Sequence, residues 1–528
     1  MDSKSPLSLS FQAEKLISDF FAALEIEKNL HHDNDKTVSS ALIYEKIRVA
    51  LEYQEEHLIL KNAIARILRR RYALALHNNV NQMTNDLINE LAWSNYLNPE
   101  LLKEQDIVKI KEIIGRNTLI LKHAISKRFK RHELQKIILD WAACEIEEYL
   151  KPSRENDVFI DYAFRIYNKN LIIDGSSQTP EQSAIQLKSV IYQLLLKPDL
   201  PLIQFWLIKQ GIPAWFSSDS EEIIKIAKSF DPYFNIIERV LNHHLRPRYV
   251  TFVKRYIAPF VLLRQVLLSK GTTLDNIKNN PRILEAMVIE RYQMVVEAGR
   301  RKVWRGTYRA LIFIICTKIS LAFLLEIPFD KYIAGEINLV SLIINVSLPP
   351  FLMLVSGTFV KSPPKKNVKN VSAVTTSIIT SDQIEDKPFR LVPQVAGGFE
   401  IFNIIYILFT LGILGVVIWL LLSLDFNILS IILFFFFVSV VSFFSFRIRN
   451  IALELAMKRS KDDAITSMME FLLLPFIRIG KFFSDKFTAF NPFIIALDFI
   501  IEAPLKTIIK IMNSWLKFIN AKKEELEL

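Results

Sequence analysis

A lysine lies in the middle of a strongly hydrophobic stretch of this 528-residue chain, where a charged side chain is most able to do chemistry. Lys318 is near the midpoint of residues 310–327, which hold eleven leucine, isoleucine and phenylalanine residues. Burying a lysine at that depth in a membrane costs roughly 2.5 to 3.5 kcal/mol, whereas each of those apolar residues contributes about 0.3 to 0.6. Insertion is still favourable, and Lys318 becomes a candidate transport or ligand contact. The structural alternative is a lysine that reaches the membrane interface or pairs with a polar neighbour such as Asn345.

Two consecutive prolines, Pro349 and Pro350, lie inside the next hydrophobic stretch, residues 337–356, which also contains Asn345. Proline removes a backbone donor and frees a carbonyl that needs another partner. The pair predicts either a broken helix that forms a site, as in transporters, or a kinked or re-entrant hairpin without a site. The structural interpretation is favoured. Lys318, Asn345, Pro349 and Pro350 are the candidate intramembrane functional residues.

Other residue patterns that signal chemistry are missing from the sequence. No Walker loop, GxGxxG, GxSxG or HExxH motif occurs. The histidines of His31-His32 and His243-His244 are more typical of solvated loops than of metal sites, and Cys144 and Cys316 lie in separate regions. We therefore expect no catalytic residues, no metal and no cofactor, which favours a non-enzyme. A membrane enzyme with an unfamiliar motif stays open as an alternative.

Four hydrophobic stretches are each near the ~20 residues that cross a bilayer, so they predict four transmembrane helices in two hairpins. The first hairpin occupies residues 300–357, and the second, stronger one occupies residues 400–446. Lysines and arginines precede the first stretch and follow the second and fourth, whereas the turn between the last two holds only Asp425. Positive charges remain on the cytoplasmic side, so both chain ends are expected there. Without a signal peptide, this topology suits a bacterial inner membrane, with an organellar membrane as the alternative.

Residues 1–299 are expected to form a multi-helix cytoplasmic region, and the fold class is therefore all-α. Only four of the 13 glycines fall in the first 290 residues, too few for a turn-rich sheet protein. Thr179-Pro180 with Gln182 is typical of a capping box at the start of a helix. A break near residue 175 separates two possible subdomains.

Two further regions complete the organisation. Residues 358–399 show no helical period and are expected to be a flexible cytoplasmic linker. Residues 447–528 form a basic amphipathic tail, in which the residues expected at headgroup depth are Trp515, Lys506, Lys510 and Lys517. The alternative is that this tail packs on the protein's own soluble region.

Basic residues exceed acidic ones by eight in residues 1–309, out of a net charge of +11 for the chain. Three concentrations stand out: Arg69–Arg71, Lys127–Arg131 and the stretch from Arg246 to Arg255. They indicate either solvated helix faces or contact with anionic lipid headgroups, while nucleic acid is not favoured for a chain tethered to a membrane. The first hypothesis is a membrane-anchored interaction or scaffold protein with an unidentified protein partner, which also leaves room for self-association. The second is a channel or transporter component that uses Lys318 and the Pro349-Pro350 break.

Overall fold

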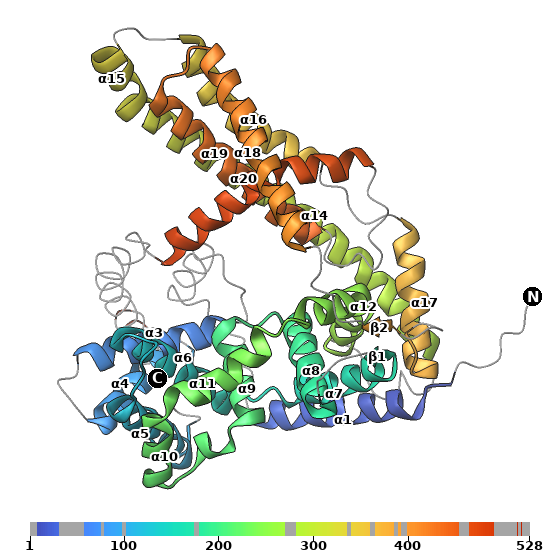
Figure 1. Cartoon of the computed structure of the whole chain (residues 1–528). Helices are drawn as coiled ribbons and strands as arrows, with labels where there is room; N and C mark the ends of the chain where they lie inside the picture. Colours follow the sequence, from blue (N-terminus) through green and yellow to red (C-terminus); the bar gives the residue numbers. More distant parts are fainter. Residues whose placement is uncertain are drawn as a thin grey trace, which may run out of the picture. The chain divides into compact units, whose positions relative to one another are not determined.

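The computed structural model describes most of the chain in separate segments (Figure 1). The described residues are 8–30, 58–74, 79–94, 96–97, 102–173, 179–269, 281–334, 339–359, 365–384, 389–391, 399–452, 464–489, 515 and 519. Nearly all of them are helical, and the two short strands, β1 (Leu171–Ile173) and β2 (Phe389–Leu391), pair with each other. The prediction of an all-α fold is confirmed. The chain divides into two compact units.

The first unit, here called the helical-core unit, comprises residues 10–171, 177–253 and 492–528. Its helices, with η3 a 3₁₀ turn, are α1 (Phe11–Leu30), α3 (Ile59–Leu74), α4 (Val80–Trp93), α5 (Glu104–His123), α6 (Arg131–Leu150), α7 (Arg154–Lys169), α8 (Pro180–Leu196), α9 (Leu200–Gly211), η3 (Pro213–Phe216), α10 (Ser220–Lys228), α11 (Phe230–Leu241) and the first part of α12 (Arg246–Leu267). The capping box predicted at Thr179 is confirmed, because its side chain accepts from the Gln182 N–H and Gln182 bonds back. Local sequence signals therefore place this helix start correctly.

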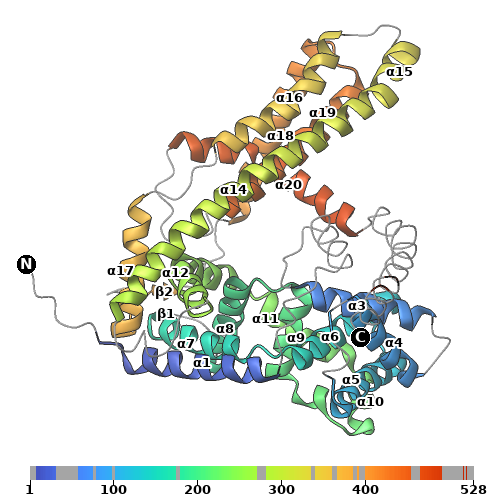
Figure 2. The ribbon, with the colours of Figure 1, turned by 180° about the vertical axis from the view of Figure 1, so that it is seen from behind.

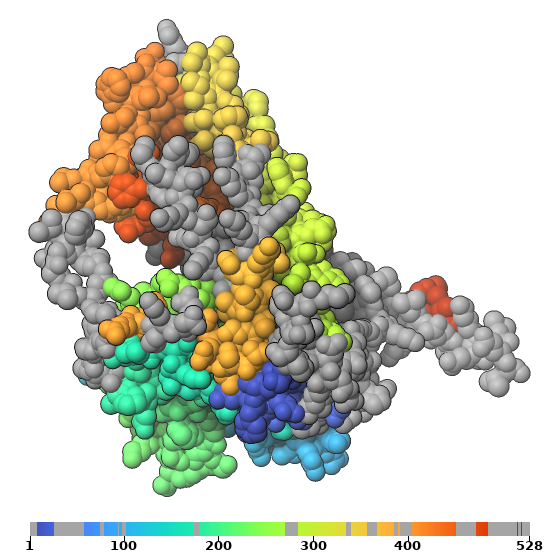
Figure 3. All heavy atoms as spheres, turned by 90° about the vertical axis from the view of Figure 1, so that its right-hand side faces the viewer, coloured from blue at the N-terminus to red at the C-terminus, as the bar shows by residue number. Residues whose placement is uncertain are grey.

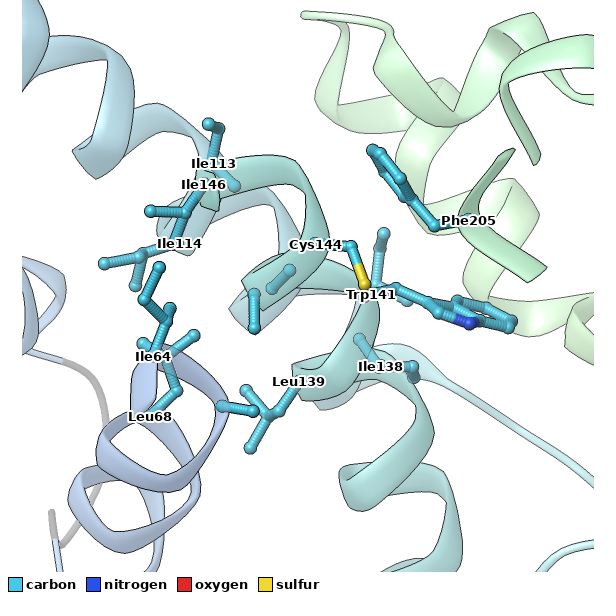
Figure 4. Packing of buried hydrophobic residues seen from close by; sticks show 14 of the residues in the cluster. Ile64, Leu68, Ile113, Ile114, Ile138, Leu139, Trp141, Cys144, Ile146 and Phe205 are labelled. Carbon is cyan, nitrogen blue, oxygen red and sulfur yellow. The ribbon is translucent and has the colours of Figure 1, made fainter. Parts of the chain in front are cut away.

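Helix α6 is the centre of this unit's core (Figure 4). Its Trp141 is fully enclosed, stacks on Phe230 and Phe234 of α11, and donates its indole N–H to Gln204 at 3.1 Å. Cys144, one turn further along, is buried in the same cluster, and burial raises the pKa of its thiol. A buried aromatic with its polar atom satisfied adds apolar area without leaving an unpaired donor. Through Trp141, helix α6 thus contacts both α9 and α11.

A group of charged side chains joins three of these helices beside the apolar core. The ammonium of Lys61 on α3 is buried and forms an ion pair with Asp199, which caps the N-terminus of α9. Glu147 of α6 lies close to both. Burial raises the pKa of the Glu147 carboxyl to about 7, although the nearby Lys61 acts in the opposite direction.

The raised pKa of Glu147 predicts a stability that falls as pH rises. Between about pH 4.5 and pH 7 the folded chain binds up to one proton more than the unfolded chain, so unfolding becomes easier by about 3 kcal/mol across that window. Glu147→Gln should raise the thermal midpoint of the full-length protein in detergent at pH 8 by about 5 °C, and leave it nearly unchanged at pH 4.5. Tryptophan fluorescence during heating measures the midpoint. Glu112→Gln, at an exposed position of α5, is the matched control, and an equal shift in both variants would contradict this linkage.

The second unit, here called the hydrophobic unit, comprises residues 1–9, 172–176 and 254–491. Its helices, with η4 and η5 π-helical, are the rest of α12, α14 (Pro281–Leu321), η4 (Ala322–Glu326), α15 (Ile327–Phe329), η5 (Asp330–Ala334), α16 (Leu339–Phe359), α17 (Lys365–Ser381), α18 (Phe399–Ser423), α19 (Ile428–Ala452) and α20 (Ala464–Ala489). Helices α14, α16 and α19 contact one another along their apolar faces. Both ribbon views show α20 lying across these helices (Figures 1 and 2). The unit is an elongated bundle with one crossing helix.

Three described helical segments are long and apolar enough to cross a membrane: Ile283–Ile333, Ile404–Ser423 and Ile428–Arg449. The predicted second span is also helical, but its apolar part, Leu339–Val355, is shorter. Only 6% of the apolar stretch of α18 is buried, and its exposed large apolar residues include Ile404, Ile407, Leu411 and Trp419. Figure 3 shows this helix (orange) at the surface. Such exposure is unfavourable in water and ordinary in lipid. By length and composition these helices are consistent with a membrane protein.

The expected linker between the hairpins contains helix α17, so the prediction that residues 358–399 lack helical structure is wrong for this part. Val371, Thr375, Ile378 and Ile379 are buried and recur at helical spacing. The helix packs on α14, where Asn367 donates to the Tyr292 hydroxyl at 2.8 Å. The β-branched residues and serines conceal the period because they have low helix propensity, which packing overrides.

Candidate functional site

Lys318 is wholly buried on α14, and its charge is compensated inside the bundle. The ammonium nitrogen lies 2.8 Å from Oε1 of Glu326 and 4.9 Å from the ring centroid of Phe437 on α19. A carboxylate and an aromatic face both favour a cation that has lost its water. Within the structural alternative for Lys318, the side chain pairs inside the bundle and does not reach outward, because it is 0% exposed.

Glu326 reaches Lys318 because the helix between them is not regular. In an α-helix, residues eight apart point about 80° away from each other, whereas residues seven apart lie within about 20°. The η4 segment forms a π-turn, in which the Ile327 N–H donates to the Ala322 carbonyl five residues earlier. A π-turn accommodates one extra residue, so the eighth residue takes the direction that the seventh has in a regular helix. Local winding therefore brings the two charges onto one face.

Asn345 on α16 binds the same carboxylate from the neighbouring helix. Its side-chain amide donates to Glu326 Oε1 and also to the Ser430 backbone carbonyl of α19 at 3.2 Å. Asn345 is fully buried. The structural alternative included a direct pairing of Lys318 with Asn345, whereas both side chains are donors here and meet at Glu326. The result, here called the polar cluster (Lys318, Glu326 and Asn345), links α14, η4, α16 and α19.

A second polar contact lies one helical turn beyond the polar cluster. The Asn427 amide donates to Asp330 of η5, and the Asn427 Oδ1 accepts from the Ser430 N–H at 2.7 Å. Asn427 thereby satisfies a free amide at the start of α19, as capping residues do. Asp330 is buried. The connection after the first hydrophobic helix is thus fastened to the start of the last one.

The two prolines do not break their helix. Helix α16 runs from Leu339 to Phe359 with Pro349 and Pro350 inside it, Pro349 buried and Pro350 half-buried. The prolines lie one turn beyond Asn345, and no side-chain bond connects them to the polar cluster. The structure thus brings together Lys318 and Asn345 from the predicted set, but not the prolines.

Sequence reasoning missed Glu326, although a signal was present. Glu326 is the only other charged residue in the predicted span 310–327, and a buried lysine needs an acidic partner. In a regular α-helix the eight-residue spacing would point the two side chains in different directions, and the π-turn that brings them together leaves no recognisable mark in the sequence.

The polar cluster keeps two acceptors that have no donor among the described residues, Glu326 Oε2 and Asn345 Oδ1. Buried acceptors of this kind are normally satisfied by protein or by water. The cluster can therefore act in two ways: as a fastening between helices, or as a place where water, a proton or a small cation is held.

Other candidate residues lie apart from the polar cluster. Trp515 is helical and 61% exposed, while Lys506, Lys510 and Lys517 lie outside the described residues. His31 and His32 also lie outside them, and the rings of His243 and His244 stand 4.4 Å apart. In the described part of the chain no three His, Cys, Asp or Glu side chains are placed to hold a metal ion.

Comparison of the chain with known proteins does not indicate a role for the polar cluster. No family model, no curated protein and no solved structure matches the chain. Its function must therefore be inferred from its own geometry.

Proposed function

We propose that this chain is a membrane-anchored interaction protein, in which the hydrophobic unit holds the helical-core unit at the cytoplasmic face of an anionic leaflet. Four spans, α14 to α16 and α18 to α19, would place both chain ends in the cytoplasm. The observation that carries the proposal is the burial of the polar cluster. Lys318, Glu326 and Asn345 are each 0% exposed and bind one another. A lysine occupied in this way stabilises helix packing and offers nothing to a passing solute.

The distribution of charge supports the orientation of this anchor. Arg300, Arg301 and Lys302 precede the first span, and Arg447 and Arg449 end the last one. The turn between α18 and α19 carries a single charge, Asp425. Positive residues are retained on the cytoplasmic side during insertion. The helical-core unit would then face the cytoplasm and its protein partners.

Site-specific photo-crosslinking in the native membrane tests the proposal. A photoreactive residue replaces Val108 or Ile236, which are exposed in the helical-core unit, and in the matched control it replaces Ile407 on the open face of α18. We expect one protein adduct of constant mass from the first two positions and lipid adducts from the third. Adducts of a second copy would indicate self-association. Protein adducts from Ile407 alone, with none from Val108 or Ile236, would reject an interaction role for the helical-core unit.

A second candidate function is a channel or transporter component that uses the polar cluster. Its support is the pair of acceptors without a described donor, Glu326 Oε2 and Asn345 Oδ1, at membrane depth. The two proposals differ when Lys318 and Glu326 are both replaced by leucine, because an anchor keeps its role and a transport site loses its charges. If the double variant and the wild-type protein give the same ion flux in proteoliposomes, the transport proposal is wrong.

A further inference from the structure

The three basic runs of the N-terminal half differ in how their charges are used. Arg69, Arg70 and Arg71 on α3 are occupied by carboxylates of the same unit: Arg69 bonds Asp140, Arg70 bonds Glu90, and Arg71 bonds Glu90 and Asp86. In the third run, Arg246 is buried and donates to Ser189 at 2.9 Å and Gln193 at 2.8 Å. These four arginines are engaged within the fold. Lys254 and Arg255 of the third run are exposed, and Arg255 lies 5.8 Å from the ring centroid of Phe389.

The run between α5 and α6 has the largest group of exposed charges among the three runs. Lys127, Lys130 and Arg131 are exposed, and no described residue forms an ion pair with them. Lys122 and Lys136 are also exposed, on the flanking helices. Glu133 is the exposed acidic residue here, and it is engaged by the Lys130 N–H at 2.8 Å. The connection carries a clear positive excess.

The backbone of this connection, here called the basic loop (residues 124–131), is fixed before any ligand binds. Ser126 Oγ accepts the N–H groups of Arg128 and Phe129, each at 3.0 Å. Asp231 accepts from the Ser126 hydroxyl and from the Lys127 N–H at 2.9 Å. The Ile125 N–H donates to the carbonyl of Ala227 at 3.1 Å.

The side chains of Arg128 and Phe129 complete this anchoring. Arg128 forms an ion pair with Glu238 and lies 5.5 Å above the Phe234 ring centroid. Phe129 packs on Phe230 and Phe234. The acidic groups near the loop thus bind Arg128 and backbone N–H groups. They do not neutralise Lys127, Lys130 or Arg131. A pre-ordered surface loses little entropy on binding.

The tip of the basic loop carries an exposed aliphatic residue among its charges. Ile125 is 61% exposed. An apolar side chain flanked by lysines and arginines matches the boundary between anionic headgroups and acyl chains. Single-stranded nucleic acid is instead bound by aromatic platforms, and the aromatic residue of this loop, Phe129, is turned into the core. The charge and the tip favour lipid.

We propose that the basic loop is an anionic-lipid docking surface, in which Lys127, Lys130 and Arg131 bind phosphate-bearing headgroups and Ile125 enters the acyl boundary. The proposal rests on the proposed function, because an anchored helical-core unit is held near a leaflet. It adds which of the three basic runs meets that leaflet.

Vesicle binding by the full-length protein tests the loop. The protein is placed in phosphatidylcholine nanodiscs and sedimented with separate vesicles that contain about 30 mol% phosphatidylglycerol, a strongly negative surface. Lys127→Gln, Lys130→Gln and Arg131→Gln together should weaken binding about a hundred-fold. The matched control is Lys111→Gln, Lys151→Gln and Lys169→Gln, three exposed positions of the same unit with the same loss of charge. Ile125→Ser should weaken binding about five-fold with no change of charge.

Three results would overturn the proposal. They are equal weakening in the loop and control variants, equal binding to vesicles without phosphatidylglycerol, and tighter binding to single-stranded RNA that the loop variant alone abolishes. Failure of the wild-type chain to enter nanodiscs would instead overturn the proposed function, so the two failures are distinguishable.

Discussion

Replacing Lys318 by leucine is expected to destabilise the hydrophobic unit by about 3 to 5 kcal/mol, because it leaves the Glu326 carboxylate buried without its cation. Asn345 still donates to that carboxylate but carries no charge. Replacing Glu326 by leucine should be similarly harmful, since Lys318 then loses its partner. The folded fraction of the full-length protein, measured by size-exclusion chromatography in mild detergent with heating, reports both effects.

The double replacement Lys318→Leu with Glu326→Leu is the decisive control. It removes both charges and leaves Asn345 bonded to the Ser430 carbonyl, so stability should return to near the wild-type value, as it does when buried ion pairs are exchanged for apolar residues. The double-mutant cycle then isolates the coupling between the two side chains. If both single variants melt at the wild-type temperature, the polar cluster does not fasten the helices, and the structural interpretation of Lys318 fails.

Gly480→Ala is expected to destabilise the packing of α20 on α19, although alanine usually favours a helix over glycine by about 1 kcal/mol. A Cβ at Gly480 would collide with the Ser439 carbonyl oxygen and stand 2.7 Å from the Phe443 Cβ. Neither neighbour is the far end of a flexible side chain, so the helices must separate. A loss of at least about 2 kcal/mol follows. Faster hydrogen exchange of the α20 amides, in the intact protein, should accompany the lower melting temperature.

Gly415 of α18 is the matched glycine for this test. A Cβ there meets no atom within 4 Å, so Gly415→Ala should be neutral or slightly stabilising. The opposite signs at the two positions distinguish close packing from helix propensity, which would act equally on both. Similar melting temperatures for the two alanine variants would show that α20 does not depend on close approach to α19.

Much of the local structure could be predicted from the sequence, because it depends on neighbours along the chain. Thr179, Pro180 and Gln182 give a helix start that the structure confirms, and the hydrophobic stretches give helices of the right length. The α17 helix was missed because its serines and β-branched residues favour other conformations when considered one at a time. Its buried face is stabilised by α14, which lies far away in sequence.

The polar cluster could be predicted only in part, for the same reason. Lys318 and Asn345 stand out as polar residues in apolar surroundings, and the structure places them together. Their common partner depends on the winding of η4 and on contacts with Ser430, 85 residues beyond Asn345. Which basic side chains have partners could not be predicted either, because the partners come from distant parts of the chain. Only the fold shows that Arg69 and Arg246 are bound by other side chains, while the side chain of Lys127 is not.

The π-turn at Ala322–Glu326 makes chain length, as much as residue identity, a determinant of this protein's stability. A π-turn is equivalent to one residue inserted into an α-helix, so deleting a single residue between Lys318 and Glu326 would restore seven-residue spacing and regular winding together. In such a shortened chain Glu326 would still face Lys318, and the residues after it, Asp330 included, would keep their directions, because the π-turn had already absorbed the extra residue. A one-residue deletion in a regular part of the helix would instead rotate every later residue by about 100°. A one-residue gap is therefore expected to be tolerated in this segment more readily than elsewhere in the helix, and a related chain is best aligned here by its gaps before its identities are compared.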